Sequence, residues 1–484
     1  MTTLARSRVR RRGGTGDSGE YVGDLAVVLH SHMPYVEGFG TYPFGEEWLF
    51  DAFARSHVPV LDVAHDVTLS VTPVLADQLE APGVVDRMRA FLAEHRVGAA
   101  ERDLAAGGEA AAAASAELDR YRRALERLDE LEGDPLEAFR ATRRERGVAL
   151  IASAATHAVL PLVGTAAGRR LQLDAGLRSH RRRFGAPAGL WLPECAYEPG
   201  LEETLAGAGV ARFCVDHSAH EPPLHSLAPV RTRSGPAAFT IDWETVALVW
   251  SARGYPSQPE YVEYHRLSPN GIRLWAVSGS PYDPGAGVRA AERDAVRFAD
   301  HVASRLGEFR ARRGTPGVVV FAIDTELLGH WWSEGPAWLA NVLRLAPERG
   351  IRLVTLPEAE RRHPGEERPL HASSWGEGKD MRTWDSPRVA DITWAARRLE
   401  LRLLAALGRG LSRDAGERAA RELLALQASD WAFLDARRQA GDYPYRRAVD
   451  HAESLLQAID SAEPPDPRMR NLAPDLRLSS LLEP

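Results

Sequence analysis

The sequence predicts an α/β protein built on an incomplete, TIM-like (β/α)7 barrel, with a helical insertion and a C-terminal α-helical domain. Seven short, nearly continuous apolar runs are separated by segments with helical periodicity. That alternation is typical of a parallel sheet covered by helices on both faces. Five of the seven runs also end in ionisable residues, as expected of a barrel whose strand ends build an active site.

The predicted strands share apolar, often β-branched residues bounded by polar or helical segments. They cover residues 24–30, 67–75, 148–154, 189–193, 211–216, 317–324 and 351–357. The ionisable residues at or just after five of these ends are His30 and His32, His157, Glu194, Asp216 and His217, and Asp324 and Glu326. These side chains are expected to meet at one mouth of the barrel.

The flanking segments divide the chain into regions of different composition. Residues 1–22 are basic and then glycine-rich, so we expect a disordered tail. The catalytic barrel is expected over 23–385, with a helical insertion at about 80–147 and an excursion over the barrel mouth at about 218–285. Residues 386–484 return to helical periodicity and predict a C-terminal helical domain that ends in a loosely packed tail.

Overall composition excludes several classes of protein. The 484 residues are 44% hydrophobic and 26% charged, which is typical of a globular domain. The net charge of −7 gives no reason to expect a nucleic-acid partner. The chain has neither a signal-peptide pattern nor a run of about 18 apolar residues, so we expect no membrane partner and a cytoplasmic location. Nothing in the composition indicates the oligomeric state.

Glu194 ends an apolar strand in the stretch GLWLPECAY (189–197). A carboxylate buried without a partner is costly, so it must be paired, exposed in a cleft, or chemically active. Asp324 ends a second strand, and two carboxylates at one barrel mouth are what glycoside cleavage requires. Because strand side chains alternate, Asp324 and Glu326 are expected on the same side, and composition alone does not say which is the acid.

Tryptophan is concentrated in the second half of the chain, where ten of the twelve lie after residue 240. A single tryptophan is more often a core residue, but indole faces also stack on the apolar faces of sugars. Trp331 beside His330, and Trp375 and Trp384 in the glycine-rich segment 373–384, fit a hydrophobic core less well. We therefore expect a carbohydrate ligand.

The pair His30 and His32 supports a rival hypothesis, because a His-x-His after a first barrel strand can hold a metal in a hydrolase. That hypothesis predicts further histidines and often a strand-end lysine, whereas the single lysine, Lys379, lies outside every predicted strand. We favour neutral histidines that bind sugar hydroxyls or orient Glu194, with no metal and no cofactor. A catalytically silent carbohydrate-binding protein is the third alternative.

Five motifs occur in order along the chain: HSHMPYV (30–36), ATHAVLP (155–161), WLPECAY (191–197), FAIDTELLGHWWSEG (321–335) and SSWGEGKDMRTW (373–384). With these motifs the chain resembles glycoside hydrolase family 57, and within it the α-1,4-glucan branching enzymes, over about residues 24–460. The resemblance implies retaining chemistry without metal on an α-glucan, with Glu194 as the nucleophile and Asp324 as the general acid/base. The substrate contacts that it implies are His30, His157, Trp275, Trp375, Trp384 and Asp430. The motif residues His32, His330 and Trp331 complete the candidate substrate site.

One segment departs from the branching enzymes that the chain resembles. Those enzymes carry a flexible loop after the nucleophile strand with a tyrosine near its tip, whereas residues 221–239 here are short and contain no tyrosine. The sequence therefore predicts either a branching enzyme, or an α-glucan hydrolase or 4-α-glucanotransferase of the same family that forms few branches.

Overall fold

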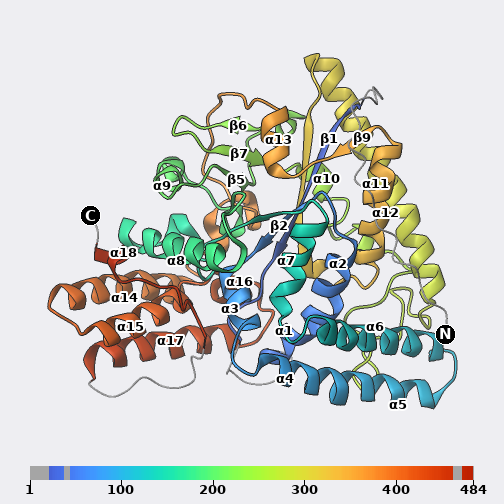
Figure 1. Ribbon diagram of the computed structural model, residues 1–484, viewed down its shortest axis with the longest axis horizontal. Coiled ribbons are helices and arrows are strands. Elements are labelled where there is room, and N and C mark those ends of the chain that lie inside the picture. The colour runs from blue at the N-terminus through green and yellow to red at the C-terminus, as the bar shows by residue number, and fades with distance from the viewer. Residues whose placement is uncertain (1–20, 37–43, 462–470, 483–484) are drawn as a thin grey trace.

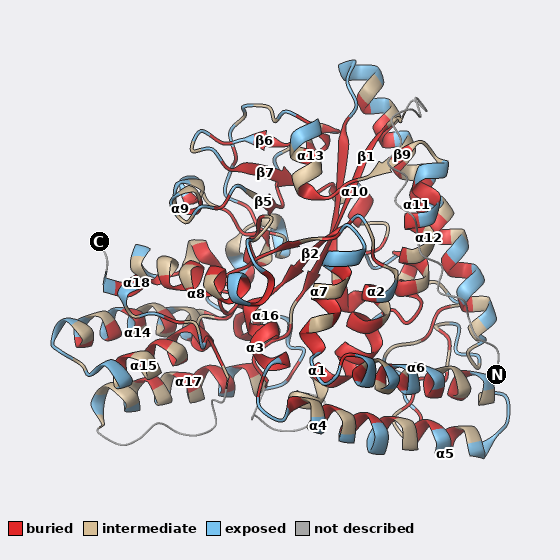
Figure 2. Ribbon diagram, in the orientation of Figure 1, coloured by how far each residue is buried: buried red, intermediate tan, exposed pale blue. Residues whose placement is uncertain are grey.

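The computed structural model describes residues 21–36, 44–461 and 471–482 and places its longest strands at the centre of the molecule (Figure 1). In the first sheet β3 (Ala149–Ile151), β2 (Thr68–Val71), β1 (Gly23–Ser31) and β8 (Val318–Asp324) lie in that order, and every pair is parallel. β9 (Ile351–Leu353) pairs with the first residues of β1. These strands are buried on both faces, as Figure 2 shows for β1, which explains their continuous apolar sequences.

The second sheet contains β4 (Leu190–Trp191), β5 (Arg212–Val215), β7 (Ala237–Thr240) and β6 (Val230–Arg231), of which only the β6–β7 pair is antiparallel. An isolated parallel bridge between Ala152 and Leu190 joins it to the first sheet beyond β3. On the other side, the backbone N–H of Asp242 donates to the carbonyl of Val320 on β8 at 2.9 Å. The two sheets thus form the incomplete, TIM-like barrel that the sequence predicts.

Several strands differ from the sequence-based expectation, and three of these differences have a clear cause or consequence. The strand predicted at 67–75 stops at Val71, because Pro73 begins helix α3 (Pro73–Leu79) and has no N–H for a sheet ladder. The strand predicted at 351–357 is only three residues long, because Thr355 and Glu358 form a capping box that begins α13 (Leu356–Arg362). β7 is a barrel strand inside the segment predicted as an excursion over the mouth.

Helices fill the connection between β2 and β3. They are α4 (Val84–Ala90), a π-helix (Phe91–Val97), α5 (Gly98–Ala106), α6 (Ala111–Glu130) and α7 (Pro135–Glu145). Preceding β2, α1 (Glu46–Ala52), a π-turn (Phe53–His57) and α2 (Val58–Val63) pack against this group. α4, α5 and α6 lie along the lower edge in Figure 1, away from the C-terminal helices.

The remaining barrel helices follow the strands and cover the sheets. They are α8 (Ala166–Phe184), α9 (Leu201–Gly207), α10 (Trp243–Val246), α11 (Pro284–Arg313) and α12 (Gly335–Glu348). Within the described ranges, no helix combines the length and the apolar composition needed to cross a bilayer. The predicted N-terminal tail, residues 1–22, lies almost entirely outside those ranges.

The C-terminal helices form a group beside the barrel, in orange and red in Figure 1. They are α14 (Ala390–Gly408), α15 (Arg413–Leu426), α16 (Ser429–Arg437) and α17 (Tyr443–Asp460), and the short α18 (Ser479–Leu482) packs against α8. The first residues of α16 reach the barrel, where the backbone N–H of Ser429 donates to the carbonyl of His157 at 3.2 Å.

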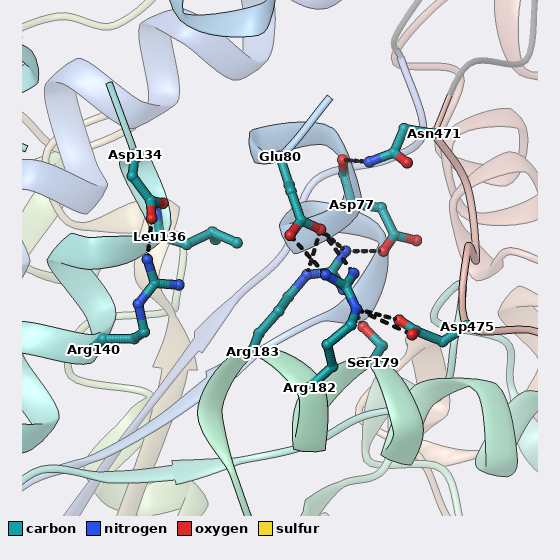
Figure 3. Close-up of polar contacts among 10 residues, drawn as sticks. All are labelled: Asp77, Glu80, Asp134, Leu136, Arg140, Ser179, Arg182, Arg183, Asn471 and Asp475. Carbon is teal, nitrogen blue, oxygen red and sulfur yellow. Dashed lines mark hydrogen bonds and ion pairs between the residues drawn. The ribbon is translucent and has the colours of Figure 1, made fainter. Parts of the chain in front are cut away.

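A polar network fastens the end of the chain to the barrel (Figure 3). Arg183 on α8 is fully buried and pairs with the equally buried Asp77 of α3 at 2.7 Å. The same Asp77 carboxylate accepts from the backbone N–H of Ala473 at 2.7 Å, and Arg182 binds Asp475 at 3.0 Å. These contacts join α3, α8 and the last described segment.

Residues 471–482 are therefore not the loosely packed tail that the sequence predicts. Leu472, Leu476 and Leu481 are buried in a hydrophobic cluster shared with α8 and α15. A single-sequence reading misses this, because the partners of these leucines lie far away in the chain.

Candidate active site

The backbone around Glu194 has an unusual conformation. After β4 the chain forms a tight 3-10 turn (Pro193–Cys195), in which Glu194 and Cys195 have φ values of 59° and 49°. Left-handed conformations of such residues cost about 1–3 kcal/mol each and persist where surrounding structure enforces them. One contact that does so is the backbone N–H of Trp375, which donates to the carbonyl of Glu194 at 2.9 Å.

The carboxylate of Glu194 lies in a largely buried, weakly polar environment. Ser429 Oγ donates to its Oε1 at 2.8 Å, and His157 Nδ1 lies 3.6 Å from the same oxygen. No arginine or lysine in the described part of the chain pairs with it. The pKa of Glu194 is raised to about 7. Burial is the main cause, the Ser429 hydrogen bond and the charge of His32 oppose the rise, and the charge of Asp430 adds to it.

Asp324 is the last residue of β8 and lies opposite His30 in the parallel register of β1 and β8. The pKa of Asp324 is raised to about 8, mainly by burial and also by the negative charges of Glu326 and Glu194, while the charge of His32 opposes the rise. The charge interaction with Glu194 means that both carboxyl groups belong to one site. Both carboxyl groups can therefore hold a proton near neutral pH.

His30 and His157 connect Glu194 to the barrel interior. His30 Nδ1 lies 3.0 Å from Ser70 Oγ, and its Nε2 lies 3.0 Å from His157 Nε2. His157 Nδ1 in turn lies 2.9 Å from Ser429 Oγ. Burial and the nearby charge of His32 lower the pKa of both rings well below the usual range, so both are neutral.

His32 differs from the other two histidines because it forms a direct hydrogen bond with a carboxylate. Its Nε2 lies 2.9 Å from Asp430 Oδ1, and its Nδ1 lies 3.1 Å from Thr72 Oγ1. Burial lowers the pKa of His32, but the charge and hydrogen bond of Asp430 and the charges of Glu326 and Glu194 outweigh burial and raise it. His32 is thus the histidine of the site that most readily carries a positive charge.

The structure corrects the expected placement of Glu326 on the same strand face as Asp324. β8 ends at Asp324, and Glu326 belongs to the 3-10 turn Thr325–Leu327, so the alternation of the strand no longer applies. Glu326 Oε1 lies 2.6 Å from His57 Nε2 and accepts from the backbone N–H of His32 at 3.0 Å. Two polar partners therefore hold Glu326, whereas Asp324 ends a strand beside a pocket.

Aromatic residues line the cavity next to Asp324. Trp375, Trp243 and Trp250 share a small pocket with this carboxyl group. Trp375 also packs edge-on against Trp191, with ring centroids 5.2 Å apart. The pocket therefore places indole rings beside the carboxyl group of Asp324.

Trp384 lies on the other side of the site. It is buried against Val159 and Ala196, and with Ser429 it lines a second pocket between the barrel and α14. Ser429 contacts Glu194, so this pocket begins next to the carboxylate.

Three predicted sugar-binding residues lie elsewhere. Trp331 is 41% exposed and packs on Tyr264, with centroids 4.5 Å apart, whereas His330 is buried beside Asp51 at 3.3 Å. The guanidinium of Arg266 lies 4.2 Å above the ring of Trp275. In the described ranges, no hydrogen bond or ion pair links these three side chains to Glu194 or Asp324.

Sequence reasoning missed the hydroxyl groups of the site. Ser429 directly precedes Asp430, a predicted substrate contact, so its position in the sequence could have marked it as a site residue. A serine alone, however, does not indicate a particular chemistry. Ser70 and Thr72 lie 40 residues from the histidines that they contact, and no local pattern marks them. Within the described residues, no group of three His, Cys, Asp or Glu side chains is arranged to hold a metal ion.

Comparisons with known proteins identify the family of the chain. The model of glycosyl hydrolase family 57 matches residues 26–371, and that of the C-terminal region of 1,4-alpha-glucan branching enzymes matches residues 393–473. A 1,4-alpha-glucan branching enzyme of Thermococcus kodakarensis is 34% identical, over 90% of this chain and 73% of that protein.

Two solved structures are similar to most of the chain. A GH57-type branching enzyme from Pyrococcus horikoshii has a TM-score of 0.85 at 31% identity, covering 94% of this chain and 100% of the other. An alpha-amylase from Thermotoga maritima has a TM-score of 0.79 at 25% identity, covering 90% and 93%. Since the family model spans well over half of the sequence, the chain belongs to glycosyl hydrolase family 57.

Proposed function

We propose that this protein is a 1,4-α-glucan branching enzyme that acts by double displacement, with Glu194 as nucleophile and Asp324 as general acid/base. The observation that carries the chemical assignment is the pair of carboxyl groups in one site, buried without a paired arginine or lysine among the described residues. Burial raises the pKa of both members, so the pair can hold a proton for the leaving oxygen near neutral pH. The similarity to named branching enzymes supports the reaction type.

In the first step, a Glu194 oxygen forms a bond to the anomeric carbon while the α-1,4 bond breaks. The proton of Asp324 passes to the departing oxygen, so the leaving chain departs as a neutral alcohol. In the second step, Asp324 accepts the proton of an incoming 6-OH, whose oxygen attacks the anomeric carbon and displaces Glu194. Two inversions give net retention.

The proposed substrate contacts divide into two groups. His30, His32, His157, Trp375, Trp384 and Asp430 surround the two carboxyl groups, directly or through Ser429. Trp275, His330 and Trp331 form an outer group. We propose that the outer group contacts sugars several units away from the cleaved bond, since a glucan chain extends well beyond it.

Trapping of the covalent intermediate tests the mechanism. Incubation with a 5-fluoro-α-glucosyl fluoride, followed by proteolysis and mass spectrometry, should label the peptide that contains Glu194. A label on a different carboxylate, or product of inverted anomeric configuration by NMR, would overturn the assignment. We further propose cytoplasmic α-glucan as the partner and no need for a metal, so chelators should leave the rate unchanged.

A second candidate is an α-glucan hydrolase or 4-α-glucanotransferase that forms few branches. It is favoured by the segment 221–239, which has no tyrosine and contributes β6 and β7 to the sheet instead of a free loop. Transfer exceeds hydrolysis only when the intermediate is shielded from water while an acceptor is held. The ratio of new α-1,6 linkages to new reducing ends on amylose decides between them, and a high ratio favours branching.

A further inference from the structure

Four consecutive hydrogen bonds connect Ser70 on β2 to the carboxylate of Glu194. They join Ser70 Oγ to His30 Nδ1, His30 Nε2 to His157 Nε2, His157 Nδ1 to Ser429 Oγ, and Ser429 Oγ to Glu194 Oε1, at 3.0, 3.0, 2.9 and 2.8 Å. All five groups are buried or nearly so. Each imidazole ring, and the hydroxyl group of Ser429, takes part in two consecutive hydrogen bonds. Which group donates in one bond therefore determines which group can donate in the next.

The hydrogen inventory of two neutral imidazoles permits one arrangement when Glu194 is ionised. A carboxylate only accepts, so Ser429 must donate its hydrogen to Glu194. Ser429 Oγ then accepts from His157 Nδ1–H, which leaves His157 Nε2 as the acceptor for His30 Nε2–H. The remaining nitrogen, His30 Nδ1, accepts from the Ser70 hydroxyl.

Protonation of Glu194 permits the opposite arrangement. The carboxyl O–H donates to Ser429 Oγ, Ser429 donates to His157 Nδ1, and His157 Nε2–H donates to His30 Nε2. His30 then carries its hydrogen on Nδ1 and donates to Ser70. All four hydrogen bonds survive in both arrangements, because a hydroxyl group at each end can both donate and accept.

We propose that Ser70, His30, His157 and Ser429 form a directed hydrogen-bond chain whose direction reports and stabilises the protonation state of Glu194. The proposal rests on the function proposed above only in calling Glu194 the nucleophile. Ser70 and Ser429 are positioning residues. The ionised carboxylate and the glycosyl ester both lack a proton on Oε1, so both accept from Ser429, and the reaction requires no rearrangement of the chain.

The charged groups around the chain are few. Asp430 and His32 act on Glu194, and Asp324 lies in the same site. His32 acts on both His30 and His157, which stay neutral. His32 is therefore the histidine expected to become an imidazolium, and it lies outside the four bonds of the chain.

Nitrogen-15 NMR of histidine-labelled full-length protein tests the proposal without any turnover. Above the pKa of Glu194, His30 should be the Nε2–H tautomer and His157 the Nδ1–H tautomer, and below it both should exchange tautomer at a common midpoint while staying neutral. Assignment uses His30→Gln and His157→Gln. The proposal would be overturned if the tautomers of His30 and His157 did not change with pH. It would also be overturned if the two rings changed at different midpoints, or if either ring became an imidazolium.

Two variants distinguish the loss of the hydrogen-bond chain from the loss of any buried hydroxyl group. Ser429→Ala should abolish the common switch and move the acidic limb of kcat/KM to higher pH, because the ionised carboxylate loses its donor. Ser153→Ala removes an equally buried hydroxyl, which donates to the carbonyl of Trp191 at 3.0 Å, and should change neither. An unchanged switch in Ser429→Ala would also overturn the proposal. If the tautomers switch in a protein that has no branching activity, the proposed function is refuted and the proposal of a hydrogen-bond chain still holds.

Discussion

Two groups of buried carboxylates in this molecule have opposite electrostatic environments. In the site, Glu194 and Asp324 are buried with no paired arginine or lysine among the described residues, and the pKa of each is raised. Beside α1 and α6, Asp51 lies 3.0 Å from Arg96, and Glu117 pairs with Arg55. Burial acts to raise the pKa there too, but the arginines outweigh it, so the pKa values of Asp51 and Glu117 are lowered.

The comparison shows that burial alone does not determine what a carboxylate does. The arginines beside Asp51 and Glu117 keep these buried acids ionised, whereas Glu194 and Asp324, which have no such partner among the described residues, can hold a proton near neutral pH. Removal of the charge should therefore affect activity in the first group and stability in the second.

The largest effect is expected at the nucleophile. Glu194→Gln should lower kcat by about 10⁴-fold or more, because an amide forms no glycosyl ester. The melting temperature should stay the same or rise, since a buried carboxylate without a cation is removed. Steady-state kinetics on amylose and calorimetry measure both, and activity within tenfold of the parent would contradict the assignment.

A loss of similar size is expected for Asp324→Asn on ordinary glucans, because the leaving oxygen loses its proton donor. Glucosyl fluoride needs little protonation, so the first step should be partly rescued with that substrate. Glu326→Gln is the matched control, and rescue in this variant instead of Asp324→Asn would exchange the two roles.

In the second group, Asp51→Ala should lower the free energy of unfolding by about 3–5 kcal/mol, because Arg96 and His330 stay buried without their anion. The kcat of the folded fraction should stay near the parent value. Urea unfolding measures the loss. Asp129→Ala, which removes a largely exposed anion paired with Arg89, should cost only about 0–1 kcal/mol.

The smallest expected effect is on the pH dependence of the unfolding free energy, which should differ between variants of Asp324 and of Asp51. The pKa of Asp324 is about 8 in the folded protein, so between about pH 4 and 8 the folded state binds a proton that the unfolded state has lost. This contribution to stability is lost as the pH rises, and Asp324→Asn should flatten the decline.

The pH dependence of stability that Asp51 contributes has the opposite sign. Its pKa is lowered in the folded protein, so it stabilises the fold above about pH 4, and this stabilisation is lost in acid. Asp51→Asn should therefore flatten the acid side of the stability curve. Unfolding free energies from pH 3 to 9 would refute the comparison if the two variants changed the same limb.

Features that depend on local sequence could be predicted. Glu194, Asp324 and His30 stand at strand ends, where burial patterns along a few residues indicate their position. Ser70 and Ser429 could not be predicted, because their roles depend on side chains 40 and 235 residues away. The four-residue strand β7 was assigned to the excursion over the mouth, because the glycine- and proline-rich turns around it hide its pairing with β5.

His330 shows a different limit. It follows the strand of Asp324 closely in sequence, but the 3-10 turn at 325–327 redirects the chain. His330 then lies buried beside Asp51, in the arginine-rich group instead of beside the two acids. The motif gives the order of these residues in the sequence. The 3-10 turn within the motif determines whether a side chain lies beside the two acids or beside Asp51.

The hydrogen bond from Ser429 to Glu194 also has a consequence for the time course of protein synthesis. The ribosome makes Glu194 235 residues before it makes its partner. A nascent chain that has completed the barrel still lacks the hydroxyl that orients its attacking oxygen and the α16 carboxylate that faces His32. Such a chain should therefore have little activity until its last quarter has emerged and docked, so an incomplete product does not act on glucan prematurely.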